Sequence, residues 1–411
     1  MMVSVGKMAL AGAVLASLLS CTSSVRTPAK AAPSKEEAYA QRLEQRLAAA
    51  PEDAGIRYCL CSAYDDAGKV NEALACLEVL DKRGWPVSIV PRDFGKSSQR
   101  PEFEPLLRRS DERVLRVSRS RLAFTAPGEL VTENVAFDPK SGSFFIGSIR
   151  LRKIVRRSGG QLQDFTAGNI QPPLLSVVGM KVDAERRTLW AASELGHGPE
   201  KGRSELLLFN VDTGELLKRF EARDGKPHLF NDVVIASNED VFMTDSVGGG
   251  VYRLSGRRTL EPFVAAGTFA YPNGVALSAD EKKLFVAFDV GIAVVDVATG
   301  AVTELRNDTP LSIAGVDGLY VYRGGLVAVQ NGTGRGRVLR LTLDATGQHV
   351  THVDVLESGN PDFQRPATAA PTTGVLDGDQ FHYVANYLPH SHELKGKPTE
   401  DVRILSLDLP H

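Results

Sequence analysis

The chain has few cysteines and little net charge for its length. Only 4 of its 411 residues are Cys while 38 are Gly, which favours a turn-rich β protein that is not held together by disulfides. The formal net charge is −2, without the clustered basic face that nucleic-acid binding requires. An apolar run from Met8 to Leu19 is too short to cross a bilayer, which takes about 20 residues, and no other segment is a better candidate. The composition therefore argues against a nucleic-acid-binding protein and against a membrane-spanning protein.

The short apolar run near the N-terminus has the features of an export signal. Lys7 provides a positive charge before it, and it ends in Leu18-Leu19-Ser20-Cys21, which resembles the bacterial lipobox. In a lipobox the Cys becomes the lipidated first residue of the mature chain. This interpretation predicts a signal peptide at 1–20, lipidation of Cys21 and a flexible tether at 21–34. The protein would then lie in the bacterial cell envelope and touch the membrane only through its lipid anchor; the alternative is ordinary signal cleavage, with Cys21 incidental.

Residues 35–110 have a helical pattern. Ser34 followed by Glu37 has the spacing of a capping box, which predicts a helix start. The core pattern of a tetratricopeptide repeat is matched by Leu60, Tyr64, Ala73 and Leu77. This resemblance spans about one repeat, and a single repeat cannot bury its own apolar face. We therefore expect three or four helices that either pack on the next domain or offer a groove to a peptide or protein partner.

Three of the cysteines, Cys59, Cys61 and Cys76, lie in this helical region. Cys59 and Cys61 do not form a CxxC pair, and no His lies at metal-ligand spacing from them. We interpret the three side chains as small buried groups. The alternative is a disulfide, because Cys76 lies on the partner helix and an exported protein meets an oxidising environment.

One hairpin pattern recurs six times after about residue 113. The first strands of the six copies begin at Glu133, Val178, Asn231, Asn273, Asp317 and Thr373. Successive starts are 42 to 56 residues apart, the spacing of propeller blades with four short strands each. In the fourth copy we expect residues 275–277 to pair with residues 284–287.

The two ends of the repeated region indicate how the ring closes. After the sixth hairpin only the strand at 401–409 remains, so the last blade lacks a strand, and the segment at 113–124 has no partner before the first blade. We expect this segment to supply the outer strand of the last blade, which removes an open sheet edge. The predicted fold class is mainly β: a six-bladed β-propeller at 113–411, preceded by a small α-helical domain at 35–110.

The starts of the innermost strands converge on the central channel of a propeller. Four of these positions carry oxygen donors, namely Glu133, Asn231, Asn273 and Asp317. Ca²⁺ prefers carboxylate and amide oxygens, and the lack of Cys and His at these positions argues against zinc or copper. Second strands end at the same face, with Ser148, Glu194, Asp245, Asp289, Asn331 and Asn386. Turns formed by Asn and Asp are the alternative explanation, but they do not account for Glu133. Gly274, behind Asn273, would let that strand begin close to the crowded axis.

Four segments carry a resemblance to a known family: "TENVAF", "LFNDVVI…VFMTDS", "YPNGVALSADEKKLFVA" and "GVDGLYVYRGGLVAVQNG". Residues 113–411 resemble the gluconolactonase/regucalcin family and, more distantly, the paraoxonases. The resemblance implies one metal at the channel mouth, usually Ca²⁺, with another divalent cation as the alternative. Its implied ligands are Glu133, Asn273 and Asp317, with Asn231 as a ligand of the metal or of the substrate.

The chemistry implied by this resemblance is metal-assisted hydrolysis of a lactone or a related ester. Asp317 is our candidate for the general base that activates water, and Asp245 and His228 are candidates for substrate contacts. Each of the last two has a structural alternative, because Asp245 could bind loop amides and His228 could be a loop residue. Paraoxonases have a His-Gly pair at the start of the second blade, whereas Val178 precedes Gly here, so a paraoxonase-like His mechanism is not expected.

Two other functional hypotheses remain open from the sequence. The first is a non-catalytic, lipid-anchored propeller with a structural metal that binds a partner through its helical domain. The second is a metal-free synthase of the strictosidine type, which has the same propeller; the pairing of Glu133 with Asn273 argues against it.

Overall fold

The computed structural model of the chain describes residues 33–196, 201–256, 259–366, 368–388 and 399–410. The expected signal peptide, the lipidation candidate Cys21 and most of the expected tether lie outside these ranges. Within them, no helix combines the length and the apolar character needed to cross a bilayer.

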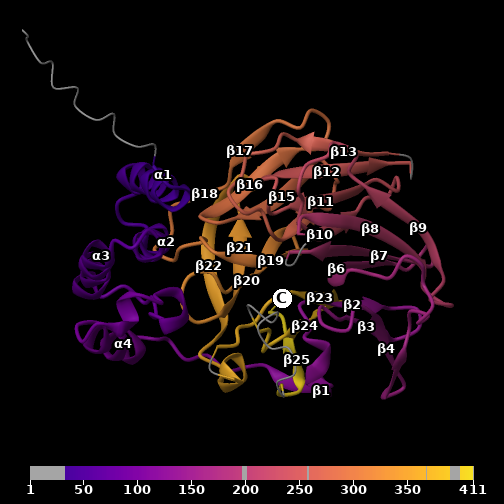
Figure 1. Cartoon of the computed structure of the whole chain (residues 1–411), viewed down its shortest axis with the longest axis horizontal. Helices are drawn as coiled ribbons and strands as arrows, with labels where there is room; N and C mark the ends of the chain where they lie inside the picture. Colours follow the sequence, from indigo (N-terminus) through magenta and orange to yellow (C-terminus); the bar gives the residue numbers. More distant parts are fainter. Residues whose placement is uncertain (1–32, 197–200, 257–258, 367, 389–398, 411) are drawn as a thin grey trace, which may run out of the picture.

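Four α-helices precede the β-structure in the described chain and gather on one side of it (Figure 1). They are α1 (Lys35–Ala49), α2 (Ala54–Asp66), α3 (Val70–Arg83) and α4 (Phe103–Glu112), with 3-10 turns at Pro91–Asp93 and Ser97–Gln99. The capping box is confirmed: the Glu37 amide donates to the Ser34 hydroxyl and the Ser34 amide donates to the Glu37 carboxylate. These bonds satisfy two N–H groups that the first turn leaves free. The expectation of three or four helices is also confirmed, while the likeness to a tetratricopeptide repeat stays a prediction.

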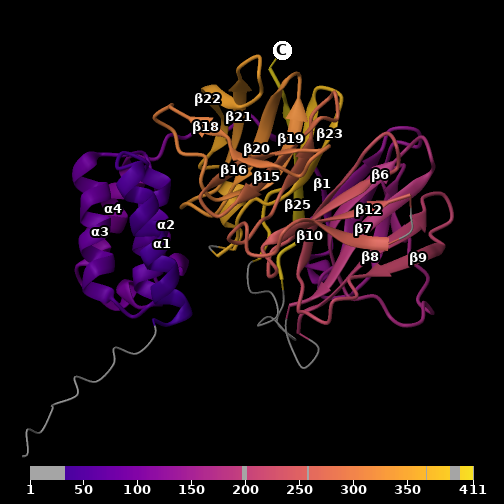
Figure 2. The ribbon, with the colours of Figure 1, turned by 90° about the horizontal axis from the view of Figure 1, so that it is seen from above.

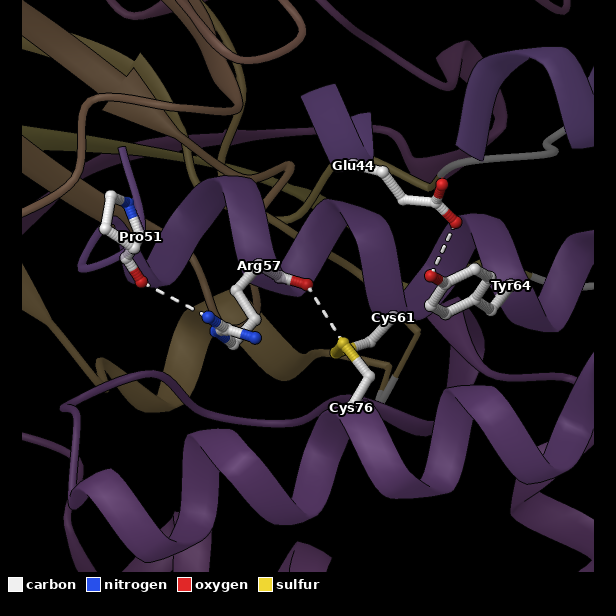
Figure 3. Close-up of a disulfide and its surroundings, with 6 residues drawn as sticks. All are labelled: Glu44, Pro51, Arg57, Cys61, Tyr64 and Cys76. Atoms are coloured by element: carbon white, nitrogen blue, oxygen red, sulfur yellow. Dashed lines mark hydrogen bonds between the residues drawn. A yellow bond between two sulfur atoms is a disulfide. The ribbon is translucent and has the colours of Figure 1, made fainter. Parts of the chain in front are cut away.

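A disulfide between Cys61 and Cys76 joins α2 to α3 (Figure 3). The interpretation of all three cysteines as unpaired is therefore wrong for these two, and the disulfide alternative is confirmed. Cys59 is free, and burial, with the nearby charge of Asp289, raises the pKa of its thiol. Cys59 and Cys61 are two residues apart on a helix, so their directions differ by about 200° around the helix axis. Only one of them can therefore face α3. The sequence does not say which face of α2 meets α3, because that depends on packing.

Loss of this disulfide should destabilise the helical region. The two cysteines are 15 residues apart, and closing a loop of that size stabilises a fold by about 3 kcal/mol through the unfolded state. We expect the double substitution Cys61→Ala with Cys76→Ala to lower the free energy of unfolding by about that amount, measured by denaturant unfolding followed by circular dichroism. Cys59→Ala is the control, and an equal effect of the two changes would contradict the prediction.

The predicted six-bladed β-propeller is confirmed, with six sheets that follow one another along the chain. Blades 1 and 2 consist of β2 (Val135–Asp138), β3 (Ser143–Gly147), β4 (Ile154–Ser158) and β5 (Gln161–Asp164), then β6 (Ser176–Asp183), β7 (Thr188–Leu195), β8 (Arg203–Asn210) and β9 (Leu216–Glu221). Blades 3 and 4 consist of β10 (Phe230–Ile235), β11 (Val241–Asp245), β12 (Gly250–Ser255) and β13 (Thr259–Val264), then β14 (Val275–Leu277), β15 (Lys283–Phe288), β16 (Gly291–Asp296) and β17 (Val302–Glu304).

Blades 5 and 6 depart from this plain order. Blade 5 consists of β19 (Val316–Tyr322), β20 (Gly325–Gln330), β21 (Arg337–Leu343) and β22 (His349–Ser358), and the short β18 (Arg306–Asn307) pairs with β22 in parallel. Blade 6 consists of β23 (Gly374–Asp377), β24 (Gln380–Val384), β25 (Val402–Asp408) and β1 (Arg121–Ala126). Further 3-10 turns lie at Gly128–Leu130 and Pro361–Gln364.

Ring closure occurs as the sequence predicts, but the closing strand is β1 (Arg121–Ala126), so only residues 121–124 of the expected segment at 113–124 belong to it. β1 pairs antiparallel with β25, with Ala126 opposite Val402 and Arg121 opposite Ser406. The first strand of the propeller is therefore the outer strand of the last blade, and the edge of β25 is covered. The expected hairpin of the fourth copy is confirmed too, since Val275 lies opposite Val286 and Leu277 opposite Leu284.

The helical region packs on blades 4 and 5, as Figures 1 and 2 show. Buried side chains of α1 and α2 share one apolar cluster with those of blade 4, including Phe288. Polar contacts reinforce this packing: the Tyr39 hydroxyl donates to Asp289 at 2.9 Å, and the Ser312 hydroxyl donates to Asp53 at 2.8 Å. Part of the helical surface is thus occupied by the propeller, and a partner for the rest of it stays a prediction.

Candidate metal and active site at the channel mouth

The first strands of the six blades form the wall of the central channel. Each contacts the first strand of the next blade, from β2 to β6, β10, β14, β19 and β23, and β23 contacts β2 again. The four predicted metal ligands lie at the starts of four of these strands. Glu133 stands two residues before β2, and Asn273 stands two residues before β14. Asn231 is the second residue of β10, and Asp317 is the second residue of β19.

Irregular pairing marks the start of several inner strands. The register of β10 shifts between Phe230 and Val233, and that of β19 shifts between Val316 and Leu319. Asn231 and Asp317 lie within these irregular steps. Bulges of this kind re-aim side chains and are frequent beside binding sites.

Gly274 joins blades 4 and 5 at the candidate site. Its amide donates a hydrogen bond of 2.7 Å to the backbone carbonyl of Asp317, and a Cβ on it would lie 2.3 Å from that same oxygen. Only Gly allows this approach. The expectation that Gly274 lets β14 begin close to the axis is therefore confirmed, and the approach brings Asn273 next to Asp317.

Two buried oxygens at this point have no hydrogen-bond partner in the described structure, Asn273 Oδ1 and Asp317 Oδ1. The other oxygen of Asp317 accepts hydrogen bonds from the Asn331 side chain at 2.5 Å and from the Thr372 hydroxyl at 2.7 Å. Within the described residues, no backbone amide donates to the side-chain oxygens of Asp317 or Asn273. The alternative explanation, a turn formed by Asn or Asp, therefore does not account for these two residues. Because unpaired buried acceptors are rare, these two oxygens indicate a missing donor or cation.

Among the described residues, Glu133 faces other carboxylates and no cation. Burial raises the pKa of Glu133 well above its usual range, and the negative charges of Asp317, Glu194 and Asp232 add to this effect. Burial also raises the pKa of Asp317, while the side chains of Thr372, Asn331 and Asn273 oppose the shift. Like charges so close together favour either protons or a bound cation.

Glu194 and Asp232 extend this carboxylate cluster beyond the predicted ligands. Burial raises the pKa of Glu194 to about 7, although the amide of Gly196 and the charge of Arg152 oppose the shift. Within the described residues, its Oε2 is buried without a close hydrogen-bond partner. Burial raises the pKa of Asp232 to about 6, although the nearby Lys181 opposes the shift. The sequence offered a signal for both residues: Glu194 ends a second strand at the same face, and Asp232 directly follows Asn231.

Two tyrosines that the sequence analysis missed lie at the same mouth. The Tyr271 side chain is 57% exposed, yet desolvation of its hydroxyl and the charges of Glu133, Asp317 and Glu194 raise its pKa to about 12. Burial and the same carboxylates raise the pKa of Tyr387 well above its usual range. Both phenols therefore stay protonated at neutral pH and can donate hydrogen bonds to a ligand in the channel mouth.

The donor set fits a hard cation only if carboxamides take part. Within the described residues, no group of three or more His, Cys, Asp and Glu side chains has an arrangement that could hold a metal. Glu133 and Asp317 supply two carboxylates, and Asn273 supplies an unpartnered amide oxygen. The Asn231 amide group donates to Ser246 at 3.2 Å, which leaves its oxygen available. This all-oxygen set, completed by water, has the chemistry that Ca²⁺ prefers.

His228 and Asp245 bind each other beside this site. His228 Nδ1 lies 2.6 Å from Asp245 and Nε2 lies 2.8 Å from Asp224, and the residue is only 6% exposed. Asp245 also accepts the amides of Leu229 and Gly248, both at 2.9 Å. These contacts are the structural alternatives considered for both residues. A role for either in substrate binding stays a prediction, and it would require one of these bonds to be exchanged.

The contacts of His228 with Asp245 and Asp224 should weaken at alkaline pH. Burial lowers the pKa of His228, but the hydrogen bonds and charges of Asp245 and Asp224 outweigh this effect and raise it. Because the pKa of His228 is raised, its contacts with Asp245 and Asp224 stabilise the fold fully below about pH 6.5. This stabilisation is lost as the pH rises through the folded-state pKa. We expect the difference in melting temperature between the wild type and His228→Gln to be largest near pH 6 and to shrink towards pH 9. The exposed His352 provides the control substitution, and a difference that does not vary with pH would contradict the prediction.

Comparisons with known proteins do not assign the chain to a family. No protein-family model matches the chain, and neither does any curated protein. Among solved structures, a gluconolactonase from Xanthomonas campestris is 16% identical, with a TM-score of 0.48 over 71% of this chain and 95% of that one. A putative oxidoreductase (glucose dehydrogenase) from Thermus thermophilus is also 16% identical, with a TM-score of 0.49 over 70% and 99%. Virginiamycin B lyase from Staphylococcus aureus, in complex with quinupristin, is 15% identical, with a TM-score of 0.46 over 66% and 80%. These similarities assign no function to the chain, so its function is argued below from its own residues.

Proposed function

We propose that this protein hydrolyses a lactone or a related ester with the help of a divalent cation, expected to be Ca²⁺, bound at the channel mouth. The observation that carries the proposal concerns the described part of the chain. There, two acidic side chains have no cation beside them, and two buried acceptor oxygens have no partner. Asn273 Oδ1 and Asp317 Oδ1 are those oxygens, and Glu133 is the carboxylate in the most unfavourable field.

The residues of the mouth divide naturally into holding and reacting groups. Glu133, Asn273 and Asp317 would hold the cation, with the oxygen of Asn231 as a further ligand of the cation or of the substrate. A cation in this position supplies Lewis-acid polarisation of the substrate carbonyl. The protonated Tyr271 and Tyr387 would orient the substrate by donating hydrogen bonds to its oxygens.

Two carboxylates are candidates for the general base. One oxygen of Asp317 is held by Asn331 and Thr372, which leaves only the other for the cation or for water. Glu194 has an unpartnered oxygen and a pKa of about 7, close to the value that general-base catalysis favours near neutral pH. Asp317 remains our first candidate, and Glu194→Gln tests the second: loss of kcat with retention of the bound cation would assign the base to Glu194.

Metal analysis followed by an activity panel tests the proposal. Purified protein should contain a bound divalent cation, and lactone and aryl-ester hydrolysis should stop in EDTA and return when Ca²⁺ is added. A bound cation with no hydrolysis of any panel member would favour the non-catalytic alternative, in which the metal is structural. Absence of cation binding would overturn the site itself.

We further propose that the protein is held in the cell envelope by a lipid on Cys21. The lipobox-like Leu18-Leu19-Ser20-Cys21 supports this proposal. The substitution Cys21→Ala should move the protein from the membrane fraction to the soluble fraction of cells, and unchanged fractionation would contradict lipidation.

A further inference from the structure

A small pocket lies between the helical region and blade 5. It encloses about 80 Å³, and both parts of the chain line it: Ser88 and Val114 belong to the N-terminal region, and Arg335 and Arg337 belong to blade 5. A single water needs about 10–15 Å³ of such space, so the pocket has room for a ligand of several non-hydrogen atoms.

Arg337 is a cation without a counter-charge in this pocket. Its Nε and Nη2 both donate to the side-chain oxygen of Gln330, the Nε bond measuring 2.9 Å, and within the described residues it makes no ion pair. Burial is the cause that lowers the pKa of Arg337, to about 10, so it still carries its charge at neutral pH. Gln330 is only 1% exposed and donates to the carbonyls of Ser312 and Ala314, so it holds the guanidinium in place.

Arg335 also lines the pocket, but its charge is already paired. Its Nη2 pairs with Asp111 at 2.6 Å and its Nη1 donates to Gln364 at 3.2 Å, whereas its Nε is buried with no hydrogen-bond partner. The Arg335–Asp111 pair balances its own charge, so Arg337 leaves the pocket with one uncompensated positive charge. A buried charge is normally paired, and a buried donor is normally bonded.

Most of the remaining pocket wall is apolar, and Thr333 and Ser358 add two polar residues to it. Pro86, Val114, Leu115, Leu311 and Val355 line it, and Leu115 is 57% exposed. A ligand that complements this lining has one negative charge, opposite Arg337, and a short aliphatic part, against the apolar side chains.

We propose that this pocket binds a small organic carboxylate, of the size of acetate to butyrate, between the helical region and blade 5. Its oxygens take hydrogen bonds from the unused donors of Arg337, and its alkyl part lies against the apolar wall. Because the pocket is lined from both sides, binding also strengthens the contact between the helical region and the propeller. This site is independent of the proposed hydrolase function.

Calorimetric titration of the purified wild-type protein tests the proposal without any substitution. We expect saturable binding of sodium acetate, propionate and butyrate at constant ionic strength, tightest for the longer two, with a matching rise in melting temperature. The neutral propionamide, sodium chloride and the longer hexanoate should bind at least tenfold more weakly. Equal binding of propionamide would overturn the role of the charge, and equal binding of chloride would overturn the assignment to a carboxylate. Absence of saturable binding by all three carboxylates would overturn the site.

Substitution of Arg337 supplies the second measurement. Arg337→Met, which keeps a long side chain but removes the charge, should weaken propionate binding at least tenfold. Arg340→Met is the matched control, because Arg340 lies on the same strand, outside the pocket lining, and donates to the carbonyl of Pro410 at 2.6 Å. Unchanged propionate binding by a folded Arg337→Met variant would contradict the proposal.

Discussion

Glu133→Gln should abolish cation binding at the channel mouth and, with it, cation-dependent hydrolysis. The change replaces a carboxylate by an amide of the same shape, so the cation loses one of its two full negative charges. Lewis-acid catalysis contributes several kcal/mol to a barrier, and about 4 kcal/mol corresponds to a loss of about 10³-fold in kcat/KM. The measurement is kcat/KM on the most active lactone or ester, together with cation affinity by calorimetry.

A stability measurement separates this result from misfolding. In the cation-free protein Glu133 is destabilised by burial and by neighbouring carboxylates, so the neutral Gln should not lower the melting temperature. Added Ca²⁺ should raise the melting temperature of the wild type but not that of the variant. The exposed Glu129, four residues earlier, provides the control Glu129→Gln, which should behave as the wild type. If Glu133→Gln binds the cation as tightly as the wild type, Glu133 is not a ligand.

Gly274→Ala should damage both the fold and the site. The added Cβ would lie 2.3 Å from the Asp317 carbonyl oxygen, a backbone atom that cannot rotate away, and the hydrogen bond between Gly274 and Asp317 would break. Overpacking of this kind costs about 1–3 kcal/mol, and we expect a loss at the upper end because two inner strands must separate. Since that separation moves Asn273 from Asp317, cation affinity should fall at least tenfold.

Gly168→Ala is the matched control for this substitution. A Cβ on Gly168 meets no atom within 4 Å, so the same chemical change tests the effect of Ala alone. Denaturant unfolding gives the stability of both variants, and calorimetry gives their cation affinity. Equal behaviour of the two variants would show that the close approach at Gly274 does not matter for the site.

Much of the propeller follows from local features of the sequence. Each hairpin is specified by a few residues, such as the short apolar run from Val275 to Leu277 and the polar turn after it. The regular spacing of six such hairpins predicts the blades. The count of strands predicts that β1 closes the ring on β25. The alignment of Glu133, Asn231, Asn273 and Asp317 also follows from the repeat, because equivalent positions of the blades face the same channel.

Other features of the site depend on which neighbouring groups bind each buried polar atom. Asp245 and Asp317 look alike in the sequence, but His228 and two loop amides occupy Asp245, whereas one oxygen of Asp317 is left without a partner. Which face of α2 meets α3, and so which cysteine pairs with Cys76, was decided by packing in the same way.

The sequence by itself determined the six blades, their closure and the oxygen-rich character of the channel mouth, because strand alternation, turn residues and repeat spacing are local. Only the tertiary structure brought Glu194 and Asp232 into the field of Glu133 and left Arg337 uncompensated beside the helical region. The pKa of a carboxylate and the pairing of a buried donor depend on burial and on neighbours from distant parts of the chain, which come together only when the blades and the helices pack.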